Sequence, residues 1–220
     1  MHPIRCLVLD HDDTCVNSSG TVGYPHFCQA LAHFRPGLTI SEHQFRRYCF
    51  DPGFHNLYQS VFGFTREELE QETAMWKEYV HSHYPVFFPG IPELMQRFRA
   101  NGGIICIVSH SSADVVLAAY KDAGVPFPDL VLGSEQPPER RKPNPWPIQY
   151  ITERFQLTAD QVLVVDDLPP GCSMAHAART MFAAAAWGGM LAETATYMRK
   201  YSDYFFDTVQ DFSNFLFESR

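Results

Sequence analysis

Two aspartates stand two positions apart near the N-terminus, in the run Asp10-His11-Asp12-Asp13-Thr14. The run follows a short apolar stretch, and alternate residues at the end of a strand point to the same side. Asp10 and Asp12 are therefore expected to share one pocket. In such a pair, one carboxylate can attack phosphorus, and the other can protonate the leaving oxygen and later activate water. An ordinary polar turn is the alternative for any single aspartate here.

A second acidic pair, Asp166-Asp167, follows another apolar run at residues 162–165. If both runs are parallel strands, the two acidic pairs meet at one edge of the sheet. Carboxylates that converge in this way require a cation. Because the set offers only oxygen ligands, with no His or Cys cluster beside it, the expected ion is Mg²⁺. Such an ion would also let a carboxylate approach an anionic phosphate.

Ser109 and Lys142 are the candidates for binding a phosphoryl group. Ser109 follows the apolar run 104–108 and offers a hydroxyl and nearby N–H groups close to a helix start. Lys142 offers a point charge within the proline-containing segment 141–145. Taken singly, Ser109 could only cap the next helix, and Lys142 could be a solvated loop lysine. With the four aspartates they complete a site for phosphoryl transfer.

The elements that would position these residues form an alternating pattern. Short apolar runs at 4–9, 104–108, 129–132 and 162–165 predict strands, and the segments 92–100, 112–123 and 147–155 predict helices. The pattern is typical of a doubly wound, Rossmann-like α/β fold with a parallel sheet, whose ligand sites lie at the carboxyl ends of the strands. Residues 181–186, 204–206 and a final helix with Phe212, Phe215 and Leu216 are expected to continue the core.

A helical insertion is predicted between the first strand and residue 89. Capping boxes begin at Ser41 and Thr65, each followed three residues later by Gln44 or Glu68. Two apolar helix faces are expected, one on a helix that begins near Pro25 and one on the last long helix of the insertion. They comprise Phe27, Leu31 and Phe34, and Leu69, Thr73, Trp76 and Val80. Residues 15–88 are thus predicted to form a small cap domain, and residues 1–14 with 89–220 the α/β core.

Composition limits the class of protein. Of the 220 residues, 45% are hydrophobic and 19% charged, which is ordinary for an ordered globular chain. The net charge of −8 argues against nonspecific binding to nucleic acid. No apolar stretch reaches the roughly 20 residues of a membrane span, and no signal peptide is evident. We expect a cytoplasmic protein, monomeric or homodimeric, whose six scattered cysteines are reduced.

Four segments together resemble the motifs of the haloacid dehalogenase superfamily, in the subgroup with a helical cap after the first motif. They are LVLDHDDTCVNS, IVSHS, RKPNPWP and VLVVDDLPPGCSMAHAAR, in the family's order and over nearly the whole chain. The resemblance extends to phosphoglycolate phosphatases, pyrophosphatases, nucleotidases and β-phosphoglucomutases, which the motifs do not separate. Two positions depart from the pattern: Asp13 stands where glycine is common, and Cys15 where an aliphatic residue is common.

The resemblance implies a role for each candidate residue. Asp10 would be the nucleophile and a Mg²⁺ ligand, and Asp12 the general acid/base, with its backbone carbonyl also on the metal. Ser109 and Lys142 would hold the phosphoryl group. Asp167 would bind the metal directly, with Asp166 as its neighbour or a second ligand. The presence of Asp12 disfavours dehalogenation, since family dehalogenases lack this second aspartate.

The resulting expectation is a Mg²⁺-dependent phosphatase of a small phosphorylated metabolite, because a closing helical cap favours small substrates. The alternatives are a phosphomutase of the β-phosphoglucomutase type and a noncatalytic binding protein with the same fold. His11 and His110 flank the expected site, and Arg46 and Arg47 lie in the cap. Packing or solvent exposure is the expectation for these four, whose roles the sequence leaves open.

Overall fold

The computed structural model describes residues 4–218. The chain divides into two compact units, of which one is Ser18–Pro85 and the other is the remainder. The ends of the smaller unit, residues 18 and 85, each lie three residues inside the ends of the predicted cap, residues 15 and 88. The two connecting segments pair with each other on the core side of this boundary, where Asn17 N donates to Val86 O at 2.9 Å and Phe88 N donates to Cys15 O at 3.0 Å.

The larger unit is built on a six-stranded sheet with the order β3-β2-β1-β4-β5-β6, in which every neighbouring pair is parallel. The strands are β1 (Cys6–Leu9), β2 (Ile104–Val108), β3 (Leu130–Leu132), β4 (Val162–Asp166), β5 (Met181–Ala185) and β6 (Tyr204–Phe206). The predicted doubly wound fold is confirmed. Leu9 lies opposite both Ile107 and Val165, so β1, β2 and β4 end within one residue of the same level. The residues that follow them therefore share one edge.

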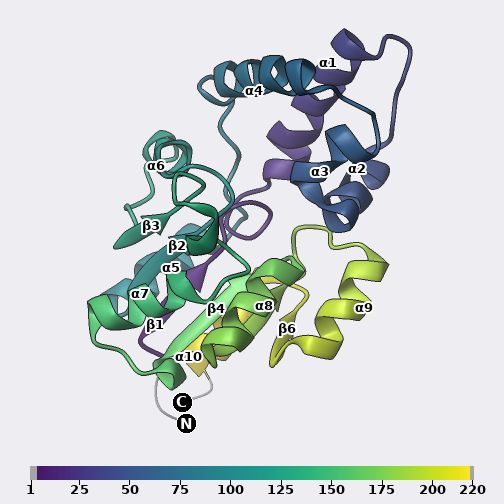
Figure 1. Ribbon diagram of the computed structural model, residues 1–220. Helices are drawn as coiled ribbons and strands as arrows, with labels where there is room; N and C mark the ends of the chain where they lie inside the picture. The colour runs from purple at the N-terminus through teal and green to yellow at the C-terminus, as the bar shows by residue number, and fades with distance from the viewer. Residues whose placement is uncertain (1–3, 219–220) are drawn as a thin grey trace. The chain divides into compact units, whose positions relative to one another are not determined.

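Helices cover both faces of this sheet (Figure 1). Leu7 and Leu9 of β1 pack with one set of helices, α5 (Ile91–Ala100), α6 (Ala113–Asp122) and α10 (Val209–Glu218). Cys6 and Val8 pack with the other set, α7 (Trp146–Phe155), α8 (Pro169–Ala178) and α9 (Ala192–Tyr201). Successive strand residues point to opposite faces, and because both faces are covered the strands are apolar throughout.

The smaller unit is helical, with α1 (Tyr24–Phe34), α2 (Glu42–Tyr48), α3 (Phe54–Ser60) and α4 (Arg66–Val80). A π-helical turn at Ser19–Gly23 precedes α1, and a kinked segment, Cys49–Gly53, with extended backbone at Asp51, precedes α3. Both predicted capping boxes are present, at Ser41 and Thr65. The core of this helical unit is aromatic and aliphatic, with Phe27, Phe45 and Leu57 among the fully buried side chains.

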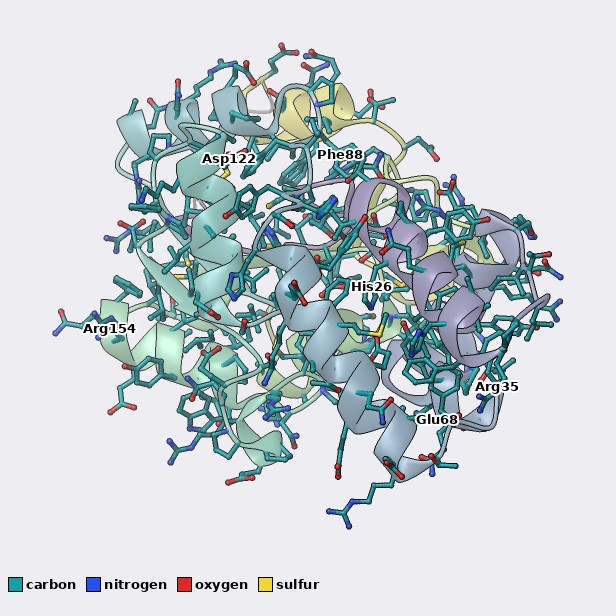
Figure 2. All side chains as sticks on the ribbon, turned by 90° about the horizontal axis from the view of Figure 1, so that it is seen from above. His26, Arg35, Glu68, Phe88, Asp122 and Arg154 are labelled. Atoms are coloured by element: carbon teal, nitrogen blue, oxygen red, sulfur yellow. The ribbon has the colours of Figure 1, made fainter. Side chains whose placement is uncertain are left out.

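The predicted buried face of α4 is wrong at one position. Thr73 is exposed and donates its hydroxyl to Leu69 O at 2.7 Å. Glu72 is buried instead, with Oε1 3.0 Å from Nε2 of buried His26, a residue of α1 (Figure 2). The pairing with His26 compensates for the burial of a carboxylate, which hydrophobic periodicity alone does not anticipate.

Short 3₁₀ turns at Pro138–Arg140 and Ala159–Gln161 complete the connections of the larger unit. Among residues 4–218, no helix combines the length and the apolar character needed to cross a membrane.

Candidate active site

The loop after β1 carries the first acidic pair in a fixed turn. Asp10 extends the sheet, since its N–H donates to Val165 O at 2.9 Å. The turn closes where the N–H groups of Cys15 and Val16 both donate to His11 O, at 2.9 and 3.1 Å. Asp13 adopts a left-handed conformation with φ of 54°, at the position where the resemblance led us to expect glycine. Asx residues tolerate this region better than most, which explains how an aspartate replaces glycine here.

Three carboxylates meet at this edge of the sheet. Asp10, Asp166 and Asp167 each offer an oxygen, and these oxygens all lie within 4.8 Å of one another. Asp166 is the last residue of β4, and its Oδ1 accepts from Leu168 N at 2.9 Å. Asp10 and Asp166 are buried, whereas Asp167 is half-buried. The parallel topology thus brings together carboxylates from segments more than 150 residues apart.

Lys142 lies between two of these carboxylates. Its Nζ donates to Asp10 Oδ1 and to Asp166 Oδ2, both at 2.7 Å, and the residue is only 6% exposed. Burial alone would lower the pKa of Lys142, but the two carboxylates outweigh it and hold the pKa above its usual value. Lys142 is therefore a charged member of the site, and the alternative of a solvated loop lysine is wrong.

The single lysine does not neutralise the cluster. Desolvation raises the pKa of Asp10 well above its usual value despite Lys142, and Asp166 and Asp12 raise it further. Desolvation likewise raises the pKa of Asp167, together with the charges of Asp166 and Asp10. A cluster with excess negative charge and only oxygen donors fits a hard divalent cation such as Mg²⁺. Asp10, Asp166 and Asp167 are the side chains that would hold it.

The carboxylate of Asp12 is bound differently. Its Oδ2 accepts two hydroxyl hydrogen bonds, from Ser109 Oγ at 3.0 Å and from Ser111 Oγ at 2.8 Å. Asp12 is absent from the three-carboxylate set found among the described residues, and its expected backbone contact with a metal stays a prediction. Ser109 does not cap the next helix, since α6 has Ser112 as its N-cap residue, so that alternative is wrong.

A sequence model described as haloacid dehalogenase-like hydrolase matches residues 7–185. The chain belongs to this family. The match begins within β1 and ends at the last residue of β5, so it spans all the elements that carry the site. No curated protein matches the sequence at a significant level.

Solved structures resemble this haloacid dehalogenase-like hydrolase over almost its whole length. A Bacteroides fragilis protein named as a haloacid dehalogenase-like hydrolase superposes with a TM-score of 0.80 at 19% identity, over 94% of this chain and 99% of its own. A Haemophilus somnus protein described as a predicted phosphoglycolate phosphatase superposes with a TM-score of 0.76 at 20% identity, over 100% of both chains. Identities at this level establish a shared fold.

The remaining polar residues named from the sequence fall outside the three-carboxylate set. His11 is 1% exposed and stacks with Tyr120, with ring centroids 6.0 Å apart, and burial lowers its pKa. His110 is half-buried. In the helical unit, Arg46 donates to Glu42 at 2.9 Å, and Arg47 is exposed. Their expected noncatalytic roles stay predictions.

Sequence reasoning missed Ser111, which contacts the same oxygen of Asp12 as Ser109 does. The available signal was the repeated serine in Ser109-His110-Ser111-Ser112 directly after β2. Serine is common in such turns, and residue spacing alone does not reveal where a hydroxyl donates its proton.

Proposed function

We propose that the protein is a Mg²⁺-dependent phosphatase of a small phosphorylated metabolite, acting through an aspartyl-phosphate on Asp10. The observation that carries this proposal is the pairing of Asp10 with Lys142, at 2.7 Å, inside a cluster of three carboxylates at the sheet edge. Membership of a hydrolase family supports it. The description of the Haemophilus somnus protein adds support for a small phosphate ester as the substrate class.

The proposed reaction has two displacements at phosphorus. The Asp10 carboxylate attacks, the bond from phosphorus to the ester oxygen breaks, and Asp12 gives its proton to that oxygen. Asp12, now a carboxylate, then takes a proton from water as the water oxygen attacks phosphorus. The bond between phosphorus and Asp10 breaks, and inorganic phosphate leaves. Asp10 and Asp12 end in their starting states.

The other residues bind and neutralise charge. Lys142 and Ser109 would bind phosphoryl oxygens, the first with a full positive charge and the second with a hydroxyl. Bound Mg²⁺ would supply positive charge that offsets the repulsion between the carboxylates and an anionic substrate. The side chains of Asp10, Asp166 and Asp167 would hold that ion, with Lys142 fixing the orientation of Asp166.

The test is phosphate release from p-nitrophenyl phosphate and a panel of small phosphate esters, with Mg²⁺ or with EDTA. We expect turnover that requires the metal, that disappears in Asp10→Asn, and that falls about 10²- to 10⁴-fold in Asp12→Asn. Asp122→Asn is the matched control, because Asp122 is exposed at the end of α6 (Figure 2). An active Asp10→Asn would refute the nucleophile. Faster phosphoryl transfer to a sugar acceptor than to water would favour the mutase.

A further inference from the structure

Two serine hydroxyls converge on one oxygen of Asp12. Ser111 Oγ donates to Asp12 Oδ2 at 2.8 Å, and Ser109 Oγ donates to the same atom at 3.0 Å. Ser111 also donates its backbone N–H to Ser109 Oγ at 2.9 Å. Because a hydroxyl carries a single proton, neither serine has a second one to give elsewhere in this arrangement.

That restriction separates the roles of the two serines once a phosphoryl group is bound. For Ser109 to donate to a phosphoryl oxygen, its proton must leave Asp12, and Asp12 then loses one of these two donors. Ser111 has no such competing task in the proposed reaction. Its hydroxyl would remain on Oδ2 and keep the Asp12 carboxyl group in place throughout both displacements.

The backbone of Ser111 is held by the neighbouring loop after β3. Ser134 N donates to Ser111 O at 3.1 Å. The Glu135 carboxylate accepts from Gly133 N at 2.9 Å and from Ala113 N at 3.0 Å, which joins that loop to the start of α6. The packing is close, since a Cβ on Gly133 would lie 2.5 Å from Ser111 O. Ser111 is thus presented to Asp12 from a backbone fixed on two sides.

We propose that Ser111 is the positioning residue for the general acid/base Asp12. The inference rests on the proposed phosphatase function. It has a specific consequence, because protonation by Asp12 matters most when the leaving group is a poor one. Misplacing Asp12 should slow the second displacement equally for all substrates, because that step is the same for each. It should slow the first displacement far more for alkyl phosphates, which release an alkoxide, than for nitrophenyl phosphate, which releases a stable phenolate.

The experiment measures kcat and KM of the full chain with Mg²⁺ on p-nitrophenyl phosphate and on glycerol phosphate. For Ser111→Ala we expect kcat/KM on glycerol phosphate to fall about 10-fold or more, with little change in kcat/KM on p-nitrophenyl phosphate, because kcat/KM reports only the steps up to the first displacement. Ser111→Thr keeps the hydroxyl and should retain most of the glycerol phosphate rate. Ser112→Ala is the matched control, because the neighbouring Ser112 makes no side-chain capping bond to α6.

Three results would overturn the inference: an equal loss of kcat/KM on both substrates, an equal loss in Ser112→Ala, or no loss in Ser111→Ala. Melting curves of each variant show whether it folds. If Ser111→Ala does not, Ser111→Cys replaces it, because a thiol is of similar size but donates weakly. A wild-type protein inactive on every ester would refute the proposed function itself. An active wild type with an unimpaired Ser111→Ala would refute only the role of Ser111.

Discussion

At the scale of single residues, the orientation of Asp166 depends on contacts from three directions. Leu168 N donates to its Oδ1, and Lys142 Nζ donates to its Oδ2. Gly171, in the first turn of α8, lies directly against the carboxyl group, because its missing side chain leaves the space that Asp166 fills. The backbone of Gly171 is helical, which any residue could adopt. Glycine is therefore needed here only because the carboxyl group of Asp166 approaches so closely.

Gly171→Ala is expected to displace Asp166. A Cβ at this position would lie 2.2 Å from Asp166 Oδ2 and 2.3 Å from its Cγ, closer than non-bonded atoms approach. We expect the variant to lose activity and about 1–3 kcal/mol of stability, since overpacked sites must shift their neighbours. Urea unfolding and the phosphatase assay measure both effects.

Gly23→Ala is the control for that substitution. Gly23 is also helical, with φ of −63°, and its added Cβ would make an ordinary contact 3.5 Å from Phe45. This variant should be unaffected or slightly more stable, because alanine restricts the unfolded chain. A Gly171→Ala protein as stable and as active as Gly23→Ala would contradict the role assigned to the close approach.

Residue types at the ends of strands were predictable from the sequence, whereas several of their contacts were not. Asp10, Ser109 and Asp166 follow or end apolar runs, and parallel pairing places such ends at one edge whatever the intervening sequence. The bonds of Ser111 to Asp12 and of Glu72 to His26 depend on side-chain direction across separate segments. Spacing within one segment does not determine that direction.

At the scale of elements, the first turn of helix α4 contains a residue, Glu68, that has two partners. Glu68 Oε2 accepts from Thr65 N at 2.8 Å, which closes the capping box. The same carboxylate pairs with both terminal nitrogens of Arg35, at 2.7 and 2.9 Å, where α1 ends (Figure 2). The hydrogen bond from Arg35, with that from Thr65, lowers the pKa of Glu68 to about 2. One side chain thus starts α4 and joins it to the end of α1.

Acid should weaken this junction. Because the pKa of Glu68 falls from 4.5 to about 2 on folding, the unfolded chain binds more protons between these values. The stabilisation is complete above pH 4.5 and is lost as the pH falls toward 2. Glu68→Gln keeps an acceptor for the capping box but removes the charge, so it should lower the stability of the helical unit at neutral pH and flatten this acid dependence.

Amide hydrogen exchange in α4, measured on the full chain at several pH values, tests that expectation. Glu70→Gln is the matched control, because Glu70 pairs with Arg66 at 3.1 Å and both side chains are largely exposed. Exposed ion pairs of this kind contribute little to the stability of the folded state. Equal protection of α4 in Glu68→Gln and Glu70→Gln would contradict the importance of the Arg35 contact.

At the scale of the whole molecule, the two units have opposite responses to acid. In the helical unit, the ionised form of Glu68 is stabilised by folding. In the α/β unit, folding removes water from around Asp10 and Asp167, places them beside other carboxylates and raises their pKa values. A site arranged for a cation is therefore a source of instability when the cation is absent, which is a frequent cost of functional clusters.

The metal-free α/β unit should become more stable as the pH falls through the raised pKa values of Asp10 and Asp167 toward 3.8. With the pKa values of Asp10 and Asp167 raised above 3.8, the folded state binds more protons than the unfolded state between the two values, so stability decreases as the pH rises through that window. Mg²⁺ would need ionised carboxylates, so the stabilisation of the folded protein by added Mg²⁺ should increase as the pH rises. Melting curves of the full chain in EDTA and in Mg²⁺, from pH 5 to pH 8, measure both trends. Asp167→Asn should reduce both of these pH trends. If the difference in melting temperature between EDTA and Mg²⁺ does not change with pH, these carboxylates do not bind the ion.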